Sequence, residues 1–111
     1  MKHENLTKVD SDEELVDRIL KGEKYLYENL IRKFNLQLYR ICLSIIKDDA
    51  AAEDVMQNAY INAYLRLSTF QKKSSFSTWI TRILINESLL YRKKIQRRET
   101  REQATEEHEY H

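Results

Sequence analysis

The chain contains a single glycine, Gly22, and no proline among its 111 residues. Tight hairpin turns and β-bulges depend on glycine, because they place the backbone in conformations with positive φ. A chain with one glycine has few ways to connect strands, whereas the interior of a helix needs neither residue. We therefore predict an all-α fold, a compact bundle of about four helices. The length suits one domain with one core.

The first two helices are predicted from caps and apolar spacing. Ser11 and Glu14 have the spacing of a capping box and Gly22 follows as a stop, which predicts a helix over about 12–21. Its apolar stripe consists of Leu15, Val16, Ile19 and Leu20. A second helix is expected over about 24–47, where apolar residues recur every three or four positions. The core-facing residues of this helix are Leu26, Leu30, Ile31, Phe34, Leu38, Ile41, Cys42 and Ile45.

The third predicted helix, over about 50–68, has two different faces. Asp48 or Asp49 is its expected N-cap. At about 100° per residue, one face is small and apolar and consists of Ala52, Met56, Ala59, Ala63 and Leu67. The opposite face mixes polar with aliphatic side chains and consists of Asp54, Gln57, Asn58, Ile61 and Leu65. Because the first face already supplies a core contact, the second is predicted to bind a partner. The alternative is that the phase of this helix is misjudged, so that the second face does not bind a partner.

The stretch "STFQKKSS", residues 68–75, is predicted to be a loop that ends in a serine N-cap, Ser74 or Ser75. A fourth helix is expected over about 76–95. Its predicted core side consists of Phe76, Trp79, Ile80, Ile83 and Leu90. Its other side consists of Arg82, Ile85, Leu89 and Arg92, with Asn86 at the border. We expect residues 1–11 to be flexible, residues 12–98 to form the domain and residues 99–111 to be a polar, disordered tail.

Charge is distributed unevenly along the chain. Residues 71–101 hold nine Lys and Arg residues against two Glu, whereas residues 102–111 hold four Glu and neither Lys nor Arg. A basic block of this density is typical of a phosphate-binding surface. It is equally compatible with a solvated helix end, and charge alone leaves both readings open.

Catalytic and metal-binding chemistry is not expected. His3, His108 and His111 lie near the chain ends, and one glycine excludes a glycine-rich phosphate loop. Ser74, Ser75 and Ser77 are interpreted as N-cap residues and not as nucleophiles. We therefore predict neither an enzyme nor a bound cofactor or metal. Cys42 is expected to be a buried thiol, which fits a cytoplasmic protein. No apolar run is long enough to cross a membrane.

A family resemblance rests on an ordered set of residues. The stretch "AAEDVMQNAYINAYLRLSTFQKKSSFSTWITRILINESLLYRKK", residues 51–94, resembles region 2 of bacterial sigma-70 family sigma factors, in particular the extracytoplasmic-function (ECF) group. The likeness extends upstream to about residue 12. The matching positions are Glu53, Asp54, Gln57, Ala59, Tyr60, Ala63, Tyr64, Phe70, Ser75, Phe76, Thr78, Trp79, Arg82, Ile83 and Asn86. The resemblance implies a helical domain that docks on the clamp helices of the largest subunit of RNA polymerase. It also implies recognition and melting of the promoter −10 element.

The resemblance assigns residues to each role. It implies polymerase binding by Asp54, Gln57, Asn58, Ile61 and Leu65. Asn58 replaces an acidic residue that many family members carry, so one ionic contact with the clamp is not expected. The 70–76 loop corresponds to a pocket for a flipped base, with Phe70 and Phe76 either framing it or anchoring the core. The favoured interpretation of Trp79 is packing in the core. The second interpretation is a wedge that separates the DNA strands. The implied DNA-binding residues are Phe70, Lys72, Lys73, Ser74, Arg82, Asn86, Leu89, Arg92 and Lys93.

Sigma factors carry a second DNA-binding domain, region 4, which is not recognisable in this chain. The implied partners are core RNA polymerase, the −10 element of promoter DNA and an anti-sigma factor, without insertion into a membrane. Leu90 stands where many family members have Asp. The promoter preference of those members is therefore not carried over to this chain. The alternative function is a sigma-like interaction module that binds polymerase or a regulator without opening DNA. A helix that lies on membranes fits less well, because Arg82 and Arg92 share a face with Ile85 and Leu89.

Overall fold

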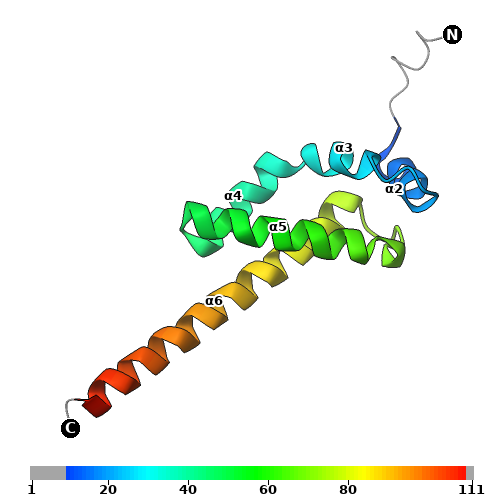
Figure 1. Cartoon of the computed structure of the whole chain (residues 1–111). Coiled ribbons are helices and arrows are strands. Elements are labelled where there is room, and N and C mark those ends of the chain that lie inside the picture. Colours follow the sequence, from blue (N-terminus) through cyan, green and yellow to red (C-terminus); the bar gives the residue numbers. More distant parts are fainter. Residues whose placement is uncertain (1–9, 110–111) are drawn as a thin grey trace, which may run out of the picture.

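The computed structural model describes the backbone of residues 10–109, and side chains up to residue 105. Most of the 1–11 segment that was expected to be flexible lies outside these residues. The helices are α2 (Asp12–Leu20), α3 (Leu26–Arg32), α4 (Asn35–Ile46), α5 (Asp49–Leu65), the short 3-10 helix η1 (Leu67–Thr69) and α6 (Phe76–Glu109) (Figure 1). Residues 10–109 contain no strand, so the predicted all-α fold is confirmed.

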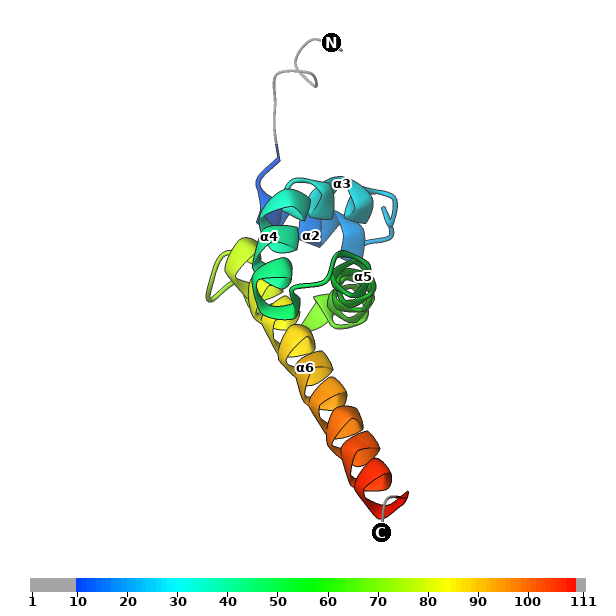
Figure 2. The ribbon, with the colours of Figure 1, turned by 90° about the vertical axis from the view of Figure 1, so that its left-hand side faces the viewer.

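The bundle lies at one end of the molecule. α4 and α5 both pack against α6, and α4 packs against α5, while α2 packs against α3. The N-terminal part of α6 lies within this bundle, and its C-terminal part extends away as a single helix (Figures 1 and 2). With 34 residues, α6 is about 51 Å long at 1.5 Å per residue. The exposed residues 96–105 belong to the part of α6 that extends away from the bundle.

The core is formed mainly by the predicted apolar faces. Leu30, Leu38 and Cys42 are fully or almost fully buried, as are the small residues of α5. Buried residues from the predicted faces of α5, η1 and α6 are Ala52, Met56, Ala59, Ala63, Leu67, Phe76, Ile80 and Ile83. Two predicted core residues are exposed: Leu20 is 50% and Leu90 is 53% exposed. On α6, Leu84 and Ser88 are buried in the core instead.

The helix predicted over 24–47 is in fact two helices. α3 ends at Arg32 and α4 begins at Asn35. At the junction Phe34 has φ −107° and ψ −3°, and its N–H donates to the carbonyl of Ile31, only three residues back. The Phe34 ring packs 5.8 Å from the ring of Phe76, centroid to centroid. This tertiary contact accounts for the break, since no glycine or proline marks it.

Most predicted helix ends are confirmed. The Ser11 hydroxyl accepts a hydrogen bond from the N–H of Glu14 (3.1 Å). Gly22, after the end of α2, has φ +122°, which favours glycine. The Asp48 carboxylate caps α5 by accepting from the N–H of Ala51 (2.9 Å). The helix predicted to run to 68 ends at Leu65, and η1 then buries Leu67 as expected.

The last helix is longer than predicted. The sequence indicated an end near 95 and a disordered tail from 99, but α6 continues to Glu109. Residues 96–105 are all exposed, so no packing against the bundle accounts for their helical conformation. Their composition does: Gln, Arg, Glu and Ala are strong helix formers. The expected tail is therefore a helical continuation through residue 109.

Candidate functional site

The outer face of α5 is exposed along its full length. The five residues predicted to bind a partner, Asp54, Gln57, Asn58, Ile61 and Leu65, are all exposed. Ile61 is 58% and Leu65 is 71% exposed, although both are aliphatic. The residues on the opposite side of the same helix are buried, so the predicted helical phase is confirmed. We call these five residues the α5 face.

A polar hollow lies beside the α5 face, between α4 and α5. It is lined by Asn35, Tyr39, Glu53, Met56, Gln57 and Tyr60. The Tyr60 hydroxyl donates to Asn35 Oδ1 (2.7 Å), and the Tyr39 hydroxyl donates to Asp49 Oδ1 (2.7 Å). Burial raises the pKa of Tyr60 to about 12. The hydrogen bond to Asp49 is the main cause that raises the pKa of Tyr39 to about 12. Sequence reasoning missed this hollow, because its lining comes from two helices.

Three aromatic residues anchor the loop between η1 and α6. Phe70 is 8% exposed and Phe76 is fully buried. Their rings meet edge to face at 5.8 Å, and the half-buried ring of Trp79 lies 5.4 Å from Phe70. The sequence left two roles open for Phe70 and Phe76, framing a base pocket or anchoring the core. In the structure both side chains anchor the core. Phe70 is thus the one residue of the predicted DNA-binding set that is buried, and Trp79 packs in the core as expected.

The polar part of the loop is tied to α2. The backbone of Lys72 is left-handed, with φ +61°, and its ammonium group lies 2.7 Å from a carboxylate oxygen of Asp17. Lys73 is exposed and forms no ion pair with the described side chains. Ser74 is partly buried. Ser75 is the N-cap, because its hydroxyl accepts from the N–H of Thr78 (3.1 Å). Sequence reasoning did not anticipate Asp17, which lies far from the loop in the chain.

The outer face of α6 carries the other predicted DNA-binding residues. Arg82, Asn86, Leu89, Arg92 and Lys93 are all exposed. At about 100° per residue, four of them form one stripe, and Arg92 lies at its edge. The opposite side of α6 buries Ile80, Leu84 and Ser88. We call the five exposed residues the α6 face.

The two faces point away from each other. α5 and α6 pack together through their buried sides, and Asn62 of α5 donates a hydrogen bond to Glu87 of α6. The exposed side of each helix therefore faces away from this shared contact. Two large partners are able to reach the domain from different sides.

Among the side chains of residues 10–105, no group of three or more His, Cys, Asp or Glu is arranged to hold a metal ion. The three histidines considered from the sequence lie outside the described side chains. None of the helices described by the structure combines the length and apolarity needed to cross a membrane.

Comparison with known proteins agrees with these features. The family model of sigma-70 region 2 matches residues 30–98. The RNA polymerase sigma-H factor of Pseudomonas aeruginosa is 35% identical over 77 residues, which cover 69% of this chain and 40% of that protein. The ECF RNA polymerase sigma-E factor of Escherichia coli K12 is 31% identical over 81 residues, which cover 73% of this chain and 42% of the relative.

The ECF RNA polymerase sigma factor SigW of Bacillus subtilis is 28% identical over 71 residues, covering 64% of this chain and 38% of the relative. This chain thus spans between 38% and 42% of the length of these relatives. The family match includes α4, α5 and the bundled part of α6, which are the elements that carry both exposed faces. The chain therefore belongs to the sigma-70 region 2 family, in its extracytoplasmic-function (ECF) group.

Proposed function

We propose that this domain acts in transcription initiation as region 2 of a sigma factor. It binds core RNA polymerase through the α5 face, and it recognises and melts the promoter −10 element through the α6 face and the 70–76 loop. The observation that carries the proposal is the pair of exposed faces on opposite sides of one core. An initiation factor must hold the enzyme and the opened DNA at the same time, and one shared surface does not allow this.

The α5 face has the composition of a protein-binding surface. Ile61 and Leu65 lie one turn apart and supply an aliphatic centre, and Asp54 and Gln57 supply polar groups beside it. An apolar centre with a polar rim is the usual anatomy of a protein interface. We propose the clamp helices of the polymerase as its partner. We also propose an anti-sigma factor that covers the same face as the corresponding regulator. Binding to these two partners implies a location in the cytoplasm.

The α6 face has the composition of a surface for nucleic acid. Arg82, Arg92 and Lys93 supply charges for phosphates, and Asn86 supplies an amide that is able to bond to a base edge. Unpairing a base costs a few kcal/mol, which enclosure of the extruded base has to offset. Since Phe70 is buried behind the loop, we assign it to holding the loop rather than to stacking on the base.

Titration of a labelled non-template −10 strand against a scrambled strand tests the proposal. We expect modest affinity for the −10 strand and weaker binding of the scrambled strand. The variant Arg82→Ala with Asn86→Ala is expected to remove this preference. The matched control is Arg66→Ala, since Arg66 is an exposed arginine at the C-terminal end of α5.

Equal affinity for both strands contradicts sequence recognition. Retained transcription by variants that lack Lys73, Arg82 and Arg92, together with intact polymerase binding, favours the alternative. In that alternative, the domain is an interaction module that does not open DNA.

A further inference from the structure

One threonine in the projecting part of α6 follows a pair of arginines. Arg97 and Arg98 stand three and two residues before Thr100. No other serine or threonine of the sequence has arginine at both of these positions. Many protein kinases select an acceptor hydroxyl by paired arginines at this spacing, because carboxylates in their substrate cleft bind guanidinium groups through two parallel hydrogen bonds. The spacing therefore indicates that Thr100 is an acceptor for phosphate.

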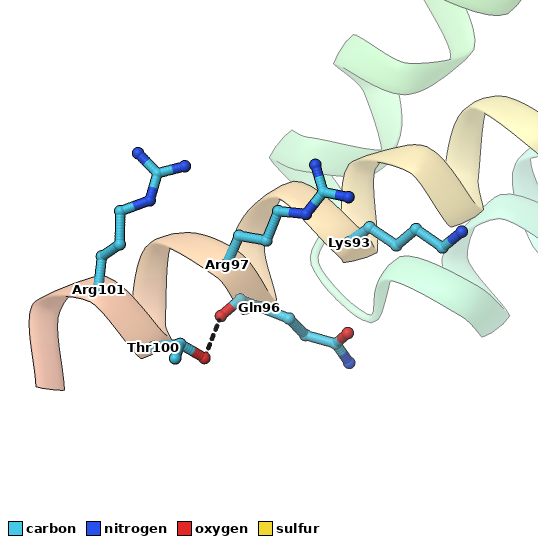
Figure 3. A pocket seen from close by; sticks show the side chains of 5 residues that line it. All are labelled: Lys93, Gln96, Arg97, Thr100 and Arg101. Carbon is cyan, nitrogen blue, oxygen red and sulfur yellow. Dashed lines mark hydrogen bonds between the residues drawn. The ribbon is translucent and has the colours of Figure 1, made fainter. Parts of the chain in front are cut away.

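The Thr100 side chain is accessible to a large partner. Thr100 is exposed, as are all residues from 96 to 105. Its hydroxyl donates to the backbone carbonyl of Gln96 (2.9 Å), and the residue borders a shallow open hollow on the helix surface. The basic residues that line the same hollow are Lys93, Arg97 and Arg101. Figure 3 shows the guanidinium groups of the two arginines pointing away from the hydroxyl. A kinase is therefore able to approach the hydroxyl from solvent.

Local unfolding around Thr100 requires little free energy. Kinases bind the acceptor segment in an extended conformation, so the helix has to open there. Residues 96–105 are all exposed, and a short helical segment without tertiary packing is marginal in water. Ser75 follows two lysines at the same spacing, but its hydroxyl accepts from the N–H of Thr78 and caps the bundled end of α6. Thr100 is therefore the more accessible of the two acceptors.

We propose that Thr100 is phosphorylated by an arginine-directed protein kinase, and that the phosphate weakens the attraction of α6 for nucleic acid. The Thr100 Oγ1 attacks the γ-phosphorus of ATP, and the bond from this phosphorus to the β-phosphate oxygen breaks. ADP leaves, and the hydroxyl proton passes to the general base of the kinase. Residues 93–102 contain five cations and two glutamates, a formal charge of +3. Because a phosphate adds about −1.5 to −2 at pH 7, this charge falls to about +1.

The phosphate has basic partners within one turn of the helix. Arg97 stands three residues before Thr100, a spacing at which side chains meet on a helix surface. The three basic residues of the hollow are spaced by four residues, and like charges at this spacing repel each other. None of them forms an ion pair with a side chain of residues 10–105. A phosphate among them reduces this repulsion and competes with an outside polyanion for the same cations. We therefore expect α6 to remain helical after phosphorylation.

Phosphorylation of the whole chain tests the acceptor site. The chain is incubated with ATP, Mg²⁺ and a purified kinase that requires arginines three and two residues before its acceptor. We expect one phosphate per chain, which mass spectrometry locates at Thr100. Arg97→Lys with Arg98→Lys keeps both charges but removes the guanidinium groups, and it is expected to lower the initial rate about tenfold. Thr105→Ala is the matched control, since Thr105 is exposed on the same helix but lacks the paired arginines. Absence of phosphate at Thr100, or preferential modification of Ser75, overturns the assignment.

The effect of the phosphate rests on the proposed function, in which α6 carries the −10 strand. Labelled −10 and scrambled strands are titrated against the unmodified and the fully phosphorylated chain. At about 50 mM salt, we expect phosphorylation to lower the affinity for both strands about tenfold. The slope of log K against log salt is expected to shrink by up to about 1.4, at about 0.7 for each of two strand phosphates that lose their cation. Thr100→Gln is the neutral control, which keeps a high helix propensity and is expected to bind like the unmodified chain.

Two binding results overturn the inferred effect of the phosphate. One is an unchanged affinity and salt slope of the phosphorylated chain, with circular dichroism verifying that α6 is helical. The other is a loss of affinity for the −10 strand alone, which means that Thr100 takes part in base recognition. If the unmodified chain binds both strands equally while phosphorylation weakens both, the proposed function fails and the phosphorylation inference stands.

Discussion

Asn62 of α5 donates its side-chain amide to the carboxylate of Glu87 on α6, and this hydrogen bond joins the two helices that carry the exposed faces. Both side chains are half-buried. The bond lies on the inner side of each helix, between the α5 face and the α6 face. It is therefore a direct link between the proposed enzyme-binding and DNA-binding helices.

Removal of one partner of this bond is expected to destabilise the domain. Glu87→Ala leaves the Asn62 amide without its acceptor in a half-buried position, which costs about 1–3 kcal/mol. Urea denaturation measures the change in the free energy of unfolding. Glu87→Gln keeps an acceptor oxygen and is expected to lose less. The double variant Asn62→Ala with Glu87→Ala is expected to lose less than the sum of the single variants, and strict additivity contradicts the contact.

Introduction of a charge on the α5 face is expected to impair polymerase binding without unfolding the domain. Ile61→Glu places a carboxylate in the aliphatic centre of the proposed interface. We expect a loss of about 30-fold in affinity for core polymerase, the effect of about 2 kcal/mol at an interface centre.

Because Ile61 is 58% exposed, the free energy of unfolding is expected to change by no more than about 0.5 kcal/mol. Leu36→Glu is the matched control, since Leu36 is 61% exposed but lies on α4. Equal losses for both variants contradict the assignment of the interface to α5.

Asp17 is expected to weaken the binding of nucleic acid by the loop. Its carboxylate pairs with Lys72 and competes with phosphate for that ammonium group. Asp17→Asn is expected to raise affinity for the −10 strand several-fold and to change stability by less than about 1 kcal/mol, since exposed ion pairs contribute little. Fluorescence anisotropy at low salt measures the gain. In a Lys72→Ala background, Asp17→Asn is expected to give no gain in affinity for the −10 strand. A gain in that background means that the overall charge of α2, and not the ion pair with Lys72, weakens binding.

The capping residues and the two faces of α5 were predictable from the sequence, because local spacing determines them. Ser11 and Asp48 cap their helices through contacts three residues away. The ion pair between Asp17 and Lys72 joins residues 55 positions apart, and no local pattern reports such a contact. The same limit applies to the break between α3 and α4, which depends on the contact of Phe34 with Phe76.

The inner side of α6 shows a second limit. Leu90 was assigned to the core because it is apolar, yet it is exposed, and Ser88 is buried in its place. The Ser88 hydroxyl donates to the carbonyl of Leu84 (2.8 Å), which satisfies it locally. Its small side chain lies against Cys42 of α4. Hydropathy alone does not identify a buried serine of this kind. The buried position of Phe70 was likewise one of two open readings until the fold was known.

Stability is expected to fall at high pH because of the tyrosines between α4 and α5. Burial raises the pKa of Tyr60 to about 12, whereas an unfolded tyrosine titrates near about 10. The folded state therefore keeps the proton at a pH where the unfolded state loses it. The resulting stabilisation is complete below about pH 10 and is lost as the pH rises toward about 12.

Urea denaturation as a function of pH measures this decline, and Tyr60→Phe is expected to make it shallower. Tyr25→Phe is the control, because Tyr25 is an exposed tyrosine of the same domain. An identical decline for Tyr60→Phe and the unchanged chain contradicts the assignment.

Simultaneous binding tests the central claim most directly. A labelled −10 strand is titrated against this chain alone and against the chain saturated with the isolated clamp helices of core polymerase. If the α5 face and the α6 face are separate surfaces, the strand binds with equal or higher affinity when the clamp helices are present. A ternary complex is then expected at equal stoichiometry of its components. Displacement of the strand by the clamp helices means that both partners use one surface, and this result contradicts the account.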